Sequence, residues 1–235
     1  MVNDFADYIL KQLGPLENPK KVDPAYAETY RGRLPDGLIN FWVEHGWGSF
    51  QKGKFWLCDP FQFKSILNFL FEGDPEFNTE DFLVYFYDAF GELSTWNKKM
   101  KFLRIKFPFN QIDFSKNQNI NKFNGDTLSD DFIIGGSIGS SLEAGSWIDE
   151  KGNQMFPQAL KKVGKLAAGE IYGFVPALSM GGDNVVENIQ RFPLKEHISF
   201  LVSVSEMKLV EYINESTSEH PFGHFQTIRS IGLQP

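Results

Sequence analysis

Apolar residues recur every three or four positions in three runs near the start of the chain, at 3–13, 24–32 and 34–46. This spacing places the apolar side chains on one face of an α-helix. A glycine ends or follows each run, and glycine is typical of the position just after a helix. The sequence therefore predicts three short amphipathic helices before any strand.

After the third helix, the pattern changes to short runs of aromatic and β-branched residues. Residues 47–50 and 54–58 flank a glycine-containing turn, which predicts a β-hairpin. Asp59 and Pro60 then favour the start of a helix that runs to Phe71. Three further runs have the composition of antiparallel strands and predict a meander: 82–87, 92–96 and 101–107.

The middle of the chain is more polar and has smaller side chains. Residues 108–126 are rich in asparagine, which predicts a loop or weak strand and a domain boundary. Residues 127–142 and 155–163 have helical patterns. The first of these carries unusually small residues on one face, so we expect another element to approach it closely.

The end of the chain contains three patterns. Residues 197–204 have the length and composition of a buried strand, residues 208–214 fit a strand or a helix, and the tail from Ser216 is polar and predicted to be irregular. Together, the patterns predict an α+β fold. In it, N-terminal helices pack on an antiparallel sheet, and a mostly helical C-terminal half with at least one buried strand follows. We expect two domains, 1–110 and 111–235, packed as one unit.

Residues 164–182 combine five glycines and several apolar residues with one carboxylate, Glu170, and one phenol, Tyr172. This composition predicts backbone that passes close to other backbone inside the fold. We expect Glu170 to fix a turn by accepting hydrogen bonds from nearby N–H groups. The alternative is that Glu170 or Glu92 is a buried acid with a raised pKa, in a small-molecule hydrolase or transferase that Tyr172 assists.

Composition and charge limit the possible partners. The chain has 235 residues, 42% hydrophobic and 15% aromatic, which suffices for a sizeable core. The net charge is −7 without a long basic run, which argues against binding to nucleic acid or a membrane surface. We see no secretion signal and no apolar run of membrane-spanning length, so we expect a cytoplasmic location.

The sequence offers little catalytic or metal-binding chemistry. Cys58 is the single cysteine, which excludes an intramolecular disulfide and a cysteine-based zinc site. His220 and His224 are close, but a proline and a glycine lie between them. Ser137 has the glycine spacing of a nucleophile turn, but it lies in a predicted helix with no strand before it. We therefore expect no catalytic residue, no metal and no cofactor.

Several stretches resemble a known family. Those that resemble the GAD-like domain are LPDGLINFWVEHGWG at 34–48, FWL at 55–57, and FGEL at 90–93 with Trp96. The stretch GEIYGFVPALSMGG at 169–182, followed by 197–204, resembles the C-terminal half of the same proteins, which are type VI secretion immunity proteins for DNase-type toxins. The resemblance implies an α+β protein that blocks a co-encoded toxin in the cytoplasm and is not an enzyme.

The expected partner is a cognate toxin that is basic at its active site, because a nuclease must attract phosphate and an acidic inhibitor complements that charge. The predicted contacts are acidic positions and one aromatic anchor: Asp126, Asp130, Asp131, Glu143, Trp147, Asp149 and Glu150. An ordinary solvated surface explains the acidic positions equally well. A third hypothesis is a ligand-sensing scaffold with an aromatic pocket formed by Trp42, Trp47, Trp56 and Trp96.

Overall fold

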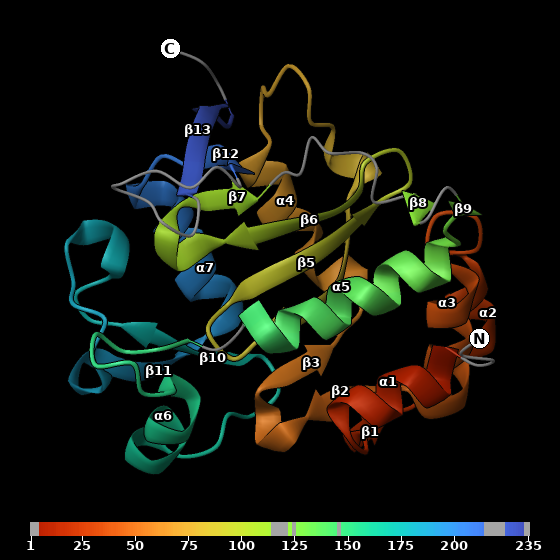
Figure 1. The fold of residues 1–235 in the computed structure, drawn as a ribbon, viewed down its shortest axis with the longest axis horizontal. Helices are drawn as coiled ribbons and strands as arrows, with labels where there is room; N and C mark the ends of the chain where they lie inside the picture. Colours follow the sequence, from red (N-terminus) through yellow and green to blue (C-terminus); the bar gives the residue numbers. More distant parts are fainter. Residues whose placement is uncertain (1–4, 114–121, 124–125, 145–146, 214–223, 233–235) are drawn as a thin grey trace.

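The computed structural model describes residues 5–113, 122–123, 126–144, 147–213 and 224–232 (Figure 1). Within these residues, no helix is both long and apolar enough to cross a membrane. The described α-helices are α1 (Phe5–Leu13), α2 (Pro24–Glu28), α3 (Asp36–His45), α4 (Lys64–Leu70), α5 (Asp130–Ala144), α6 (Met155–Val163) and α7 (Leu194–Val204).

A nine-stranded sheet runs through the centre of the structure in the order β1-β2-β3-β4-β5-β6-β7-β12-β13 (Figure 1). Its strands are β1 (Glu17–Lys20), β2 (Trp47–Phe50), β3 (Phe55–Leu57), β4 (Leu83–Asp88), β5 (Glu92–Asn97), β6 (Lys101–Lys106), β7 (Gln111–Asp113), β12 (Lys208–Ile213) and β13 (His224–Ser230). Among these nine described strands, β7 and β12 pair in parallel and the other neighbours pair antiparallel. Two small antiparallel sheets pair β10 (Glu170–Phe174) with β11 (Ile189–Pro193) and β8 (Lys122–Phe123) with β9 (Asp126–Thr127).

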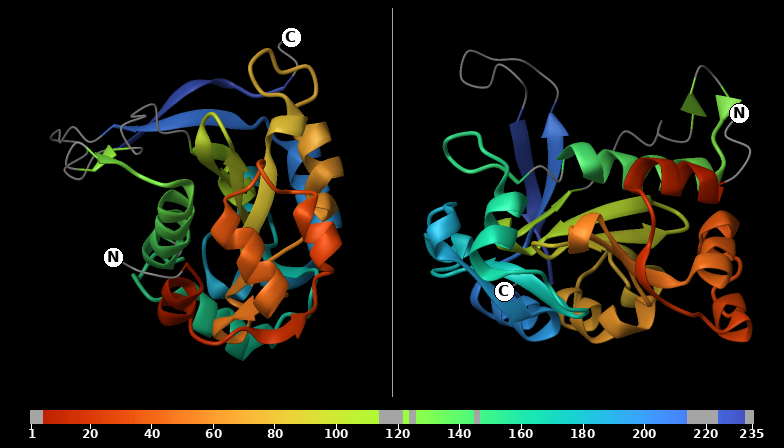
Figure 2. Two further views of the ribbon diagram at one scale, coloured as in Figure 1. Left: turned by 90° about the vertical axis from the view of Figure 1, so that its right-hand side faces the viewer. Right: turned by 90° about the horizontal axis from the view of Figure 1, so that it is seen from below.

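Helices cover both faces of the sheet, and each face has its own hydrophobic core. Figure 2 (left) shows α5 on one side of the sheet and α4 on the other. Strand β3 contributes to both cores: Phe55 and Leu57 join the side chains of α1, α3 and α5, whereas Trp56 joins those of α4 and α7. The side chains divide in this way because successive residues of a strand point to opposite faces.

A β-bulge in β4 directs two consecutive residues into the same core. The register between β4 and β5 shifts between Val84 and Phe86. Tyr85 and Phe86 both lie in the core that includes α5, and Tyr87 lies in the opposite core. Since a bulge inserts one extra residue into a strand, it changes which face the following side chains occupy. The Tyr85 hydroxyl thereby reaches the α5 helix.

The N-terminal half follows the sequence pattern closely. The three predicted helices correspond to α1, α2 and α3, the hairpin to β2 and β3, and the meander to β4, β5 and β6. Asp59 caps the next helical segment as predicted, because its Oδ1 accepts a hydrogen bond from the Phe61 N–H at 3.0 Å. A 3-10 turn (Pro60–Phe63) then leads into α4. The predicted α+β class is confirmed.

The C-terminal half corrects three predictions. It is not mostly helical, since strands β7 to β13 accompany α5, α6 and α7. Residues 197–204 belong to helix α7 and not to a buried strand: Leu194, Ile198 and Leu201 bury one helical face. A continuous apolar run is compatible with either structure, so periodicity alone did not separate them. The tail is not irregular throughout, since β13 pairs with β12, and this pairing also identifies residues 208–213 of the ambiguous segment as a strand. The helices predicted at 127–142 and 155–163 correspond to α5 and α6.

Both halves of the chain contribute to the sheet and to one core. Strands β12 and β13 extend the sheet beyond β7. The core beneath α4 and α7 contains Phe90 and Leu93 together with Trp147 and Ile171. The division into domains 1–110 and 111–235 stays a prediction.

A partly buried ion pair ties β13 to the loop after α4. The Asp74 carboxylate accepts hydrogen bonds from Arg229 at 2.6 and 2.9 Å, and from the N–H groups of Glu76, Phe77 and Gly232. Burial by itself raises the pKa of Asp74, but these hydrogen bonds outweigh it and hold the pKa at about 2. The folded state therefore favours the charged carboxylate.

We expect Asp74→Asn to lower the free energy of unfolding at pH 7 by about 2 kcal/mol, because it removes the carboxylate that pairs with Arg229. The loss should shrink as the pH falls from about 4 to 2, since protonation of Asp74 removes the same interaction from the native protein. Urea unfolding at pH 7 and pH 3 measures both effects. Glu76→Gln is the matched control, because Glu76 is an exposed partner of the same arginine. Equal stability of Asp74→Asn and the native protein at pH 7 would contradict this account.

Candidate functional site

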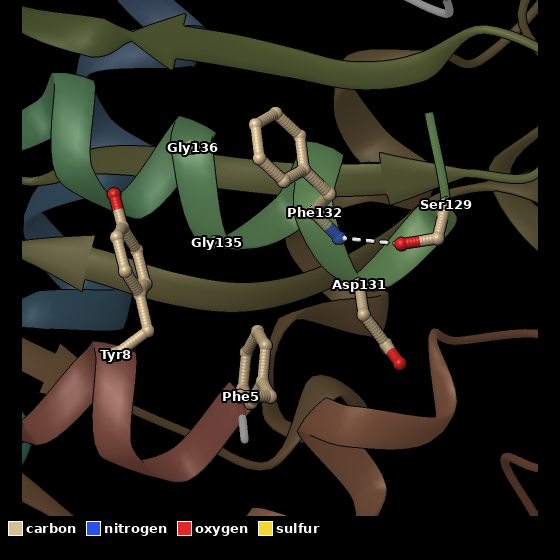
Figure 3. Close-up of a pocket in the computed structure, with 7 residues that line it drawn as sticks. All are labelled: Phe5, Tyr8, Ser129, Asp131, Phe132, Gly135 and Gly136. Carbon is tan, nitrogen blue, oxygen red and sulfur yellow. Dashed lines mark hydrogen bonds between the residues drawn. The ribbon is translucent and has the colours of Figure 1, made fainter. Parts of the chain in front are cut away.

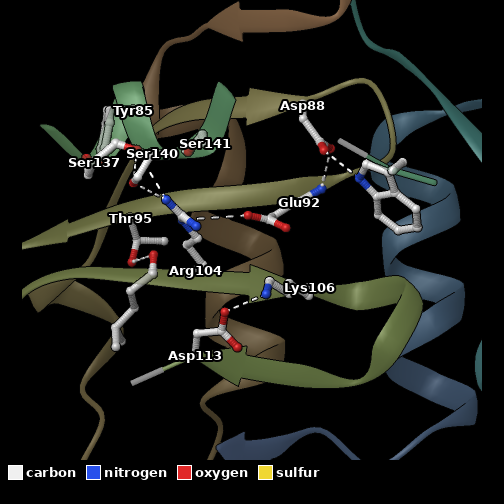
Figure 4. A network of polar contacts seen from close by, with 12 residues as sticks. Tyr85, Asp88, Glu92, Thr95, Arg104, Lys106, Asp113, Ser137, Ser140 and Ser141 are labelled. Carbon is white, nitrogen blue, oxygen red and sulfur yellow. Dashed lines mark hydrogen bonds and ion pairs between the residues drawn. The ribbon is translucent and has the colours of Figure 1, made fainter. Parts of the chain in front are cut away.

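A group of buried and partly buried charged side chains lies on the face of the central sheet that α5 packs against (Figure 4). Glu92 comes from β5, Arg104 and Lys106 from β6, and Asp113 from β7. The Arg104 Nε lies 3.7 Å from a Glu92 oxygen, and the Lys106 Nζ lies 2.6 Å from an Asp113 oxygen. Adjacent strands thus place opposite charges side by side on one face of the sheet.

Arg104 connects this group to α5. Its guanidinium donates to the Ser137 carbonyl at 3.3 Å and to the Ser140 hydroxyl. The Ser137 and Tyr85 hydroxyls lie 2.5 Å apart (Figure 4). Ser137 also donates to the Ile134 carbonyl at 2.7 Å. The small residues of α5 therefore allow close contact with the sheet, and Ser137 is part of that packing.

The Glu92 carboxyl is enclosed. Its pKa is raised to about 7 in total: burial and then the nearby Asp88 carboxylate raise it, and Lys106 and Arg104 act in the opposite direction. Among the described residues, the space beside Glu92 and Asp88 is too small to hold a water molecule. A general acid or base must come within hydrogen-bond reach of its substrate. The surroundings of Glu92 fit a structural role better than catalysis.

Asp88 ends β4 and fixes the turn into β5. One carboxylate oxygen accepts hydrogen bonds from the N–H groups of Phe90 and Glu92, both at 2.9 Å. The other oxygen accepts the Trp147 indole N–H at 2.8 Å. Burial raises the pKa of Asp88, and these hydrogen bonds oppose that rise. A single carboxylate therefore joins a tight turn of the sheet to the segment after α5.

Trp147 lies in the core and not on the surface. It is 8% exposed, and its ring stacks on Phe90 with the ring centroids 4.6 Å apart. Phe109 and Phe174 stack against the same indole. The indole is therefore buried in the isolated chain, and the expected role of Trp147 as an aromatic anchor for a partner stays a prediction.

Glu170 and Tyr172 fix the loop that precedes β10. The Glu170 carboxylate accepts the Ala167 N–H at 2.8 Å and lies 3.9 Å from Arg191. The Tyr172 hydroxyl donates to the Gly164 carbonyl at 2.7 Å. The predicted turn-fixing role of Glu170 is confirmed. These contacts give its carboxylate a structural task, which weakens the catalytic alternative.

The predicted acidic positions lie at opposite ends of α5. At its start, Asp130 pairs with Lys101 at 2.8 Å, and Asp131 accepts the Gly37 N–H at 2.7 Å in the first turn of α3. The helix has 15 residues and is therefore about 22 Å long. The structure separates these two aspartates from the acidic positions beyond the other end of the helix.

Beyond α5, Asp149 shapes a turn and Glu150 is exposed. The Asp149 carboxylate accepts hydrogen bonds from the N–H groups of Asn153 and Lys151, at 2.8 and 2.9 Å. The Asn153 hydrogen bond contributes most to lowering the pKa of Asp149 to about 2. The side chains of Asp126 and Glu143 lie outside the described part of the structure. The role of the acidic positions in partner binding stays a prediction.

A pocket of about 330 Å³ lies between α1 and α5 (Figure 3). Phe5 and Tyr8 from α1 face Phe132 from α5 across it, and glycines of α5 form the surface between them. Two of its polar groups are already engaged: the Ser129 hydroxyl accepts the Phe132 N–H at 3.2 Å, and Asp131 accepts the Gly37 N–H. The pocket has an aromatic lining without an evident reactive group.

The four tryptophans of the scaffold hypothesis do not form one pocket. Trp56 lies in the core that includes α4 and α7, where it stacks on Tyr87 with the ring centroids 5.9 Å apart. Trp42, Trp47 and Trp96 belong to the other core, on the opposite side of the sheet. The structure therefore does not support a shared aromatic site.

An apolar groove of about 450 Å³ lies between the β10–β11 pair and α7, and we call it the β10–α7 groove. The sequence pattern did not predict it. Its lining comes from two segments of the chain: Phe174, Val175, Pro176, Ala177 and Met180 from the first, and Phe192, Pro193, Glu196, His197 and Phe200 from the second.

No group of three or more histidine, cysteine, aspartate or glutamate side chains in the described ranges has the arrangement of a metal site. The close histidine pair of the sequence does not add to this search, because His220 lies outside the described residues.

Comparisons with known proteins give a family match in each half of the chain. Residues 4–109 match the GAD-like domain, and residues 139–205 match the C-terminal domain of the T6SS immunity protein Tdi1. The chain carries a GAD-like domain followed by a Tdi1-type immunity domain. The crystal structure of Atu4351 from Agrobacterium tumefaciens has a TM-score of 0.80 and 26% sequence identity, and covers 97% of this chain and 98% of that chain. No curated protein sequence shows significant similarity.

Each of the two matched domains contains one of the candidate sites. The Glu92 and Arg104 pair lies in the GAD-like domain. The Tdi1-type domain includes α6, β10, β11 and α7, and therefore the whole β10–α7 groove. The family resemblance inferred from the sequence motifs is confirmed.

We expect Glu92→Gln to change how stability depends on pH. The pKa of Glu92 is raised from 4.5 to about 7, so the folded protein binds more protons than the unfolded chain between these values. The contribution of Glu92 to the free energy of unfolding therefore falls, by about 3 kcal/mol, as the pH rises through this window. Relative to the native protein, the variant should gain stability from pH 5 to pH 8. Urea unfolding across this range measures the gain, and parallel curves for the two proteins would refute the assignment.

Proposed function

We propose that the chain is an immunity protein that binds and neutralises a co-encoded toxin of a type VI secretion system in the cytoplasm of the producing cell. The match of residues 139–205 to the C-terminal domain of the immunity protein Tdi1 carries this proposal. An immunity domain implies a cognate toxin as its partner. The fold supports a binding role, since both halves pack into shared cores that can present a preformed surface.

We further propose that the toxin is a nuclease and that the chain occludes its active site. A nuclease groove is positively charged, and the net charge of this chain is −7. Opposite charges speed association and favour the correct partner. The acidic positions near α5, with Glu150 the exposed example, are the predicted steering charges. Salt should therefore slow association more than it speeds dissociation.

The enzymatic alternative receives less support from the geometry. Glu92 is enclosed between the sheet and α5, and Glu170 holds the loop before β10. A catalytic role for either residue would require a substrate to reach its carboxyl group. A binding function makes no such demand on these two residues.

Co-expression tests the proposal directly. Expression of the toxin from the neighbouring gene should stop the growth of a bacterial host and degrade its DNA. Expression of the chain in the same cells should restore growth and keep the DNA intact, because the toxin is occupied. Colony counts and gel analysis of genomic DNA measure the two effects. The proposal would be ruled out if the protein from the neighbouring gene is harmless alone, or if it kills the host equally well with the chain present.

Two variants separate binding from catalysis in the same assay. Glu92→Gln and Glu170→Gln should protect as well as the native chain at equal protein levels, because neither carboxyl is required for occlusion. Loss of protection by a folded Glu92→Gln protein would favour the enzymatic alternative.

A further inference from the structure

The walls of the β10–α7 groove are held in place by backbone hydrogen bonds. The β10–β11 pairing runs from Glu170 opposite Pro193 to Phe174 opposite Ile189. Beyond the strand, the Val175 N–H donates to the Asn188 carbonyl at 2.8 Å. The Leu194 N–H, at the start of α7, donates to the Gly169 carbonyl at 2.8 Å. The groove is therefore formed before any partner arrives, which lowers the entropic cost of binding.

A histidine forms part of the groove lining. The His197 ring stacks on Phe192 with the ring centroids 4.3 Å apart. It packs so closely on Gly173 that a Cβ at this position would collide with the ring. Burial lowers the pKa of His197 to about 4, which keeps the imidazole neutral at physiological pH. The ring makes no hydrogen bond within the described residues, so it adds a neutral polar group to an otherwise apolar wall.

The rim of the groove exposes large apolar side chains. Met180 is 57% exposed, Phe200 46% and Val175 44%. Pro176 and Pro193 also line the groove, and proline has no backbone N–H to offer to water. Water in this groove has few hydrogen-bond partners, so its displacement by an apolar side chain is favourable. An exposed apolar patch with these features is typical of an interaction site.

The charge at the rim indicates what kind of side chain the groove accepts. Glu196 is exposed on α7 and forms no ion pair within the described residues. The chain as a whole carries a net charge of −7. The occupant that complements this surface is an apolar side chain with a lysine or arginine beside it. A second copy of the chain fits less well, because two molecules with the same net negative charge repel each other.

We propose that the β10–α7 groove is the anchor site for the toxin. One apolar side chain of the toxin enters between Met180 and Phe200, and a neighbouring lysine or arginine faces the Glu196 carboxylate. The groove volume of about 450 Å³ accommodates one large side chain. This inference rests on the immunity function proposed above and assigns it to a surface of the Tdi1-type domain.

Binding measurements with single variants test the anchor site. The probe is the purified toxin from the neighbouring gene, immobilised on a sensor, with the full-length chain in solution. Met180→Glu and Phe200→Glu should each raise the Kd at least tenfold, mainly through faster dissociation, because a carboxylate replaces an anchor contact. Glu196→Lys should raise the Kd at least tenfold, and Glu196→Gln by about threefold, because a rim charge contributes less than a buried anchor.

Phe61→Glu is the matched control. Phe61 is 70% exposed, lies before α4 and does not line the groove, so this variant should bind within twofold of the native chain. Thermal unfolding of every variant checks that the fold is retained. The altered positions are surface-exposed, so the unfolding temperatures should stay close to that of the native chain.

The outcomes separate this inference from the proposed function. If the native chain does not bind the toxin, the immunity function itself is lost. If the native chain binds and all groove variants bind within twofold of it, the anchor site is wrong and the immunity function stands. If the native chain forms a dimer that Phe200→Glu disrupts, the groove is a self-association surface and the inference is overturned.

Discussion

The buried carboxylate of Asp88 accepts hydrogen bonds from two backbone N–H groups of the β4–β5 turn and from the indole of Trp147. Loss of these donors would leave the buried Asp88 carboxylate without hydrogen bonds, which costs free energy. The carboxylate therefore holds the β4–β5 turn and the segment after α5 in fixed positions. Trp147 then stacks on Phe90 and Phe174. Phe174 ends β10 and also lines the β10–α7 groove, so the position of the groove depends on the contacts of Trp147 with Asp88 and Phe174.

The two matched domains contribute different parts of this arrangement. The GAD-like domain provides most of the central sheet, with a hydrophobic core on each face. The Tdi1-type domain provides α6, the β10–β11 pair and α7, which present an apolar groove with the Glu196 carboxylate at its rim. In the function that we propose, the overall negative charge accelerates encounter with a basic toxin, and the groove slows dissociation once the complex has formed.

The sequence predicted elements whose patterns are local. The amphipathic helices and the strand meander followed from periodicity, and the turn-fixing role of Glu170 followed from its glycine-rich surroundings. Helix α7 was missed because its apolar run also fits a buried strand. Strand β13 was missed because its polar sequence becomes a strand only by pairing with β12. The burial of Trp147 depends on Asp88, which lies 59 residues away, and no local signal marks that pairing. The sequence signal available for the groove was the run of apolar residues around Pro176, at 174–180.

Hydrogen–deuterium exchange of the chain, alone and with saturating toxin, tests the central claim most directly. The claim is that a preformed face of the Tdi1-type domain receives the toxin. The account predicts slower exchange of backbone amides at 177–182 and 194–200 in the complex, with unchanged exchange in α2. Slower exchange confined to other surfaces, with both groove segments unchanged in a saturated complex, would contradict it.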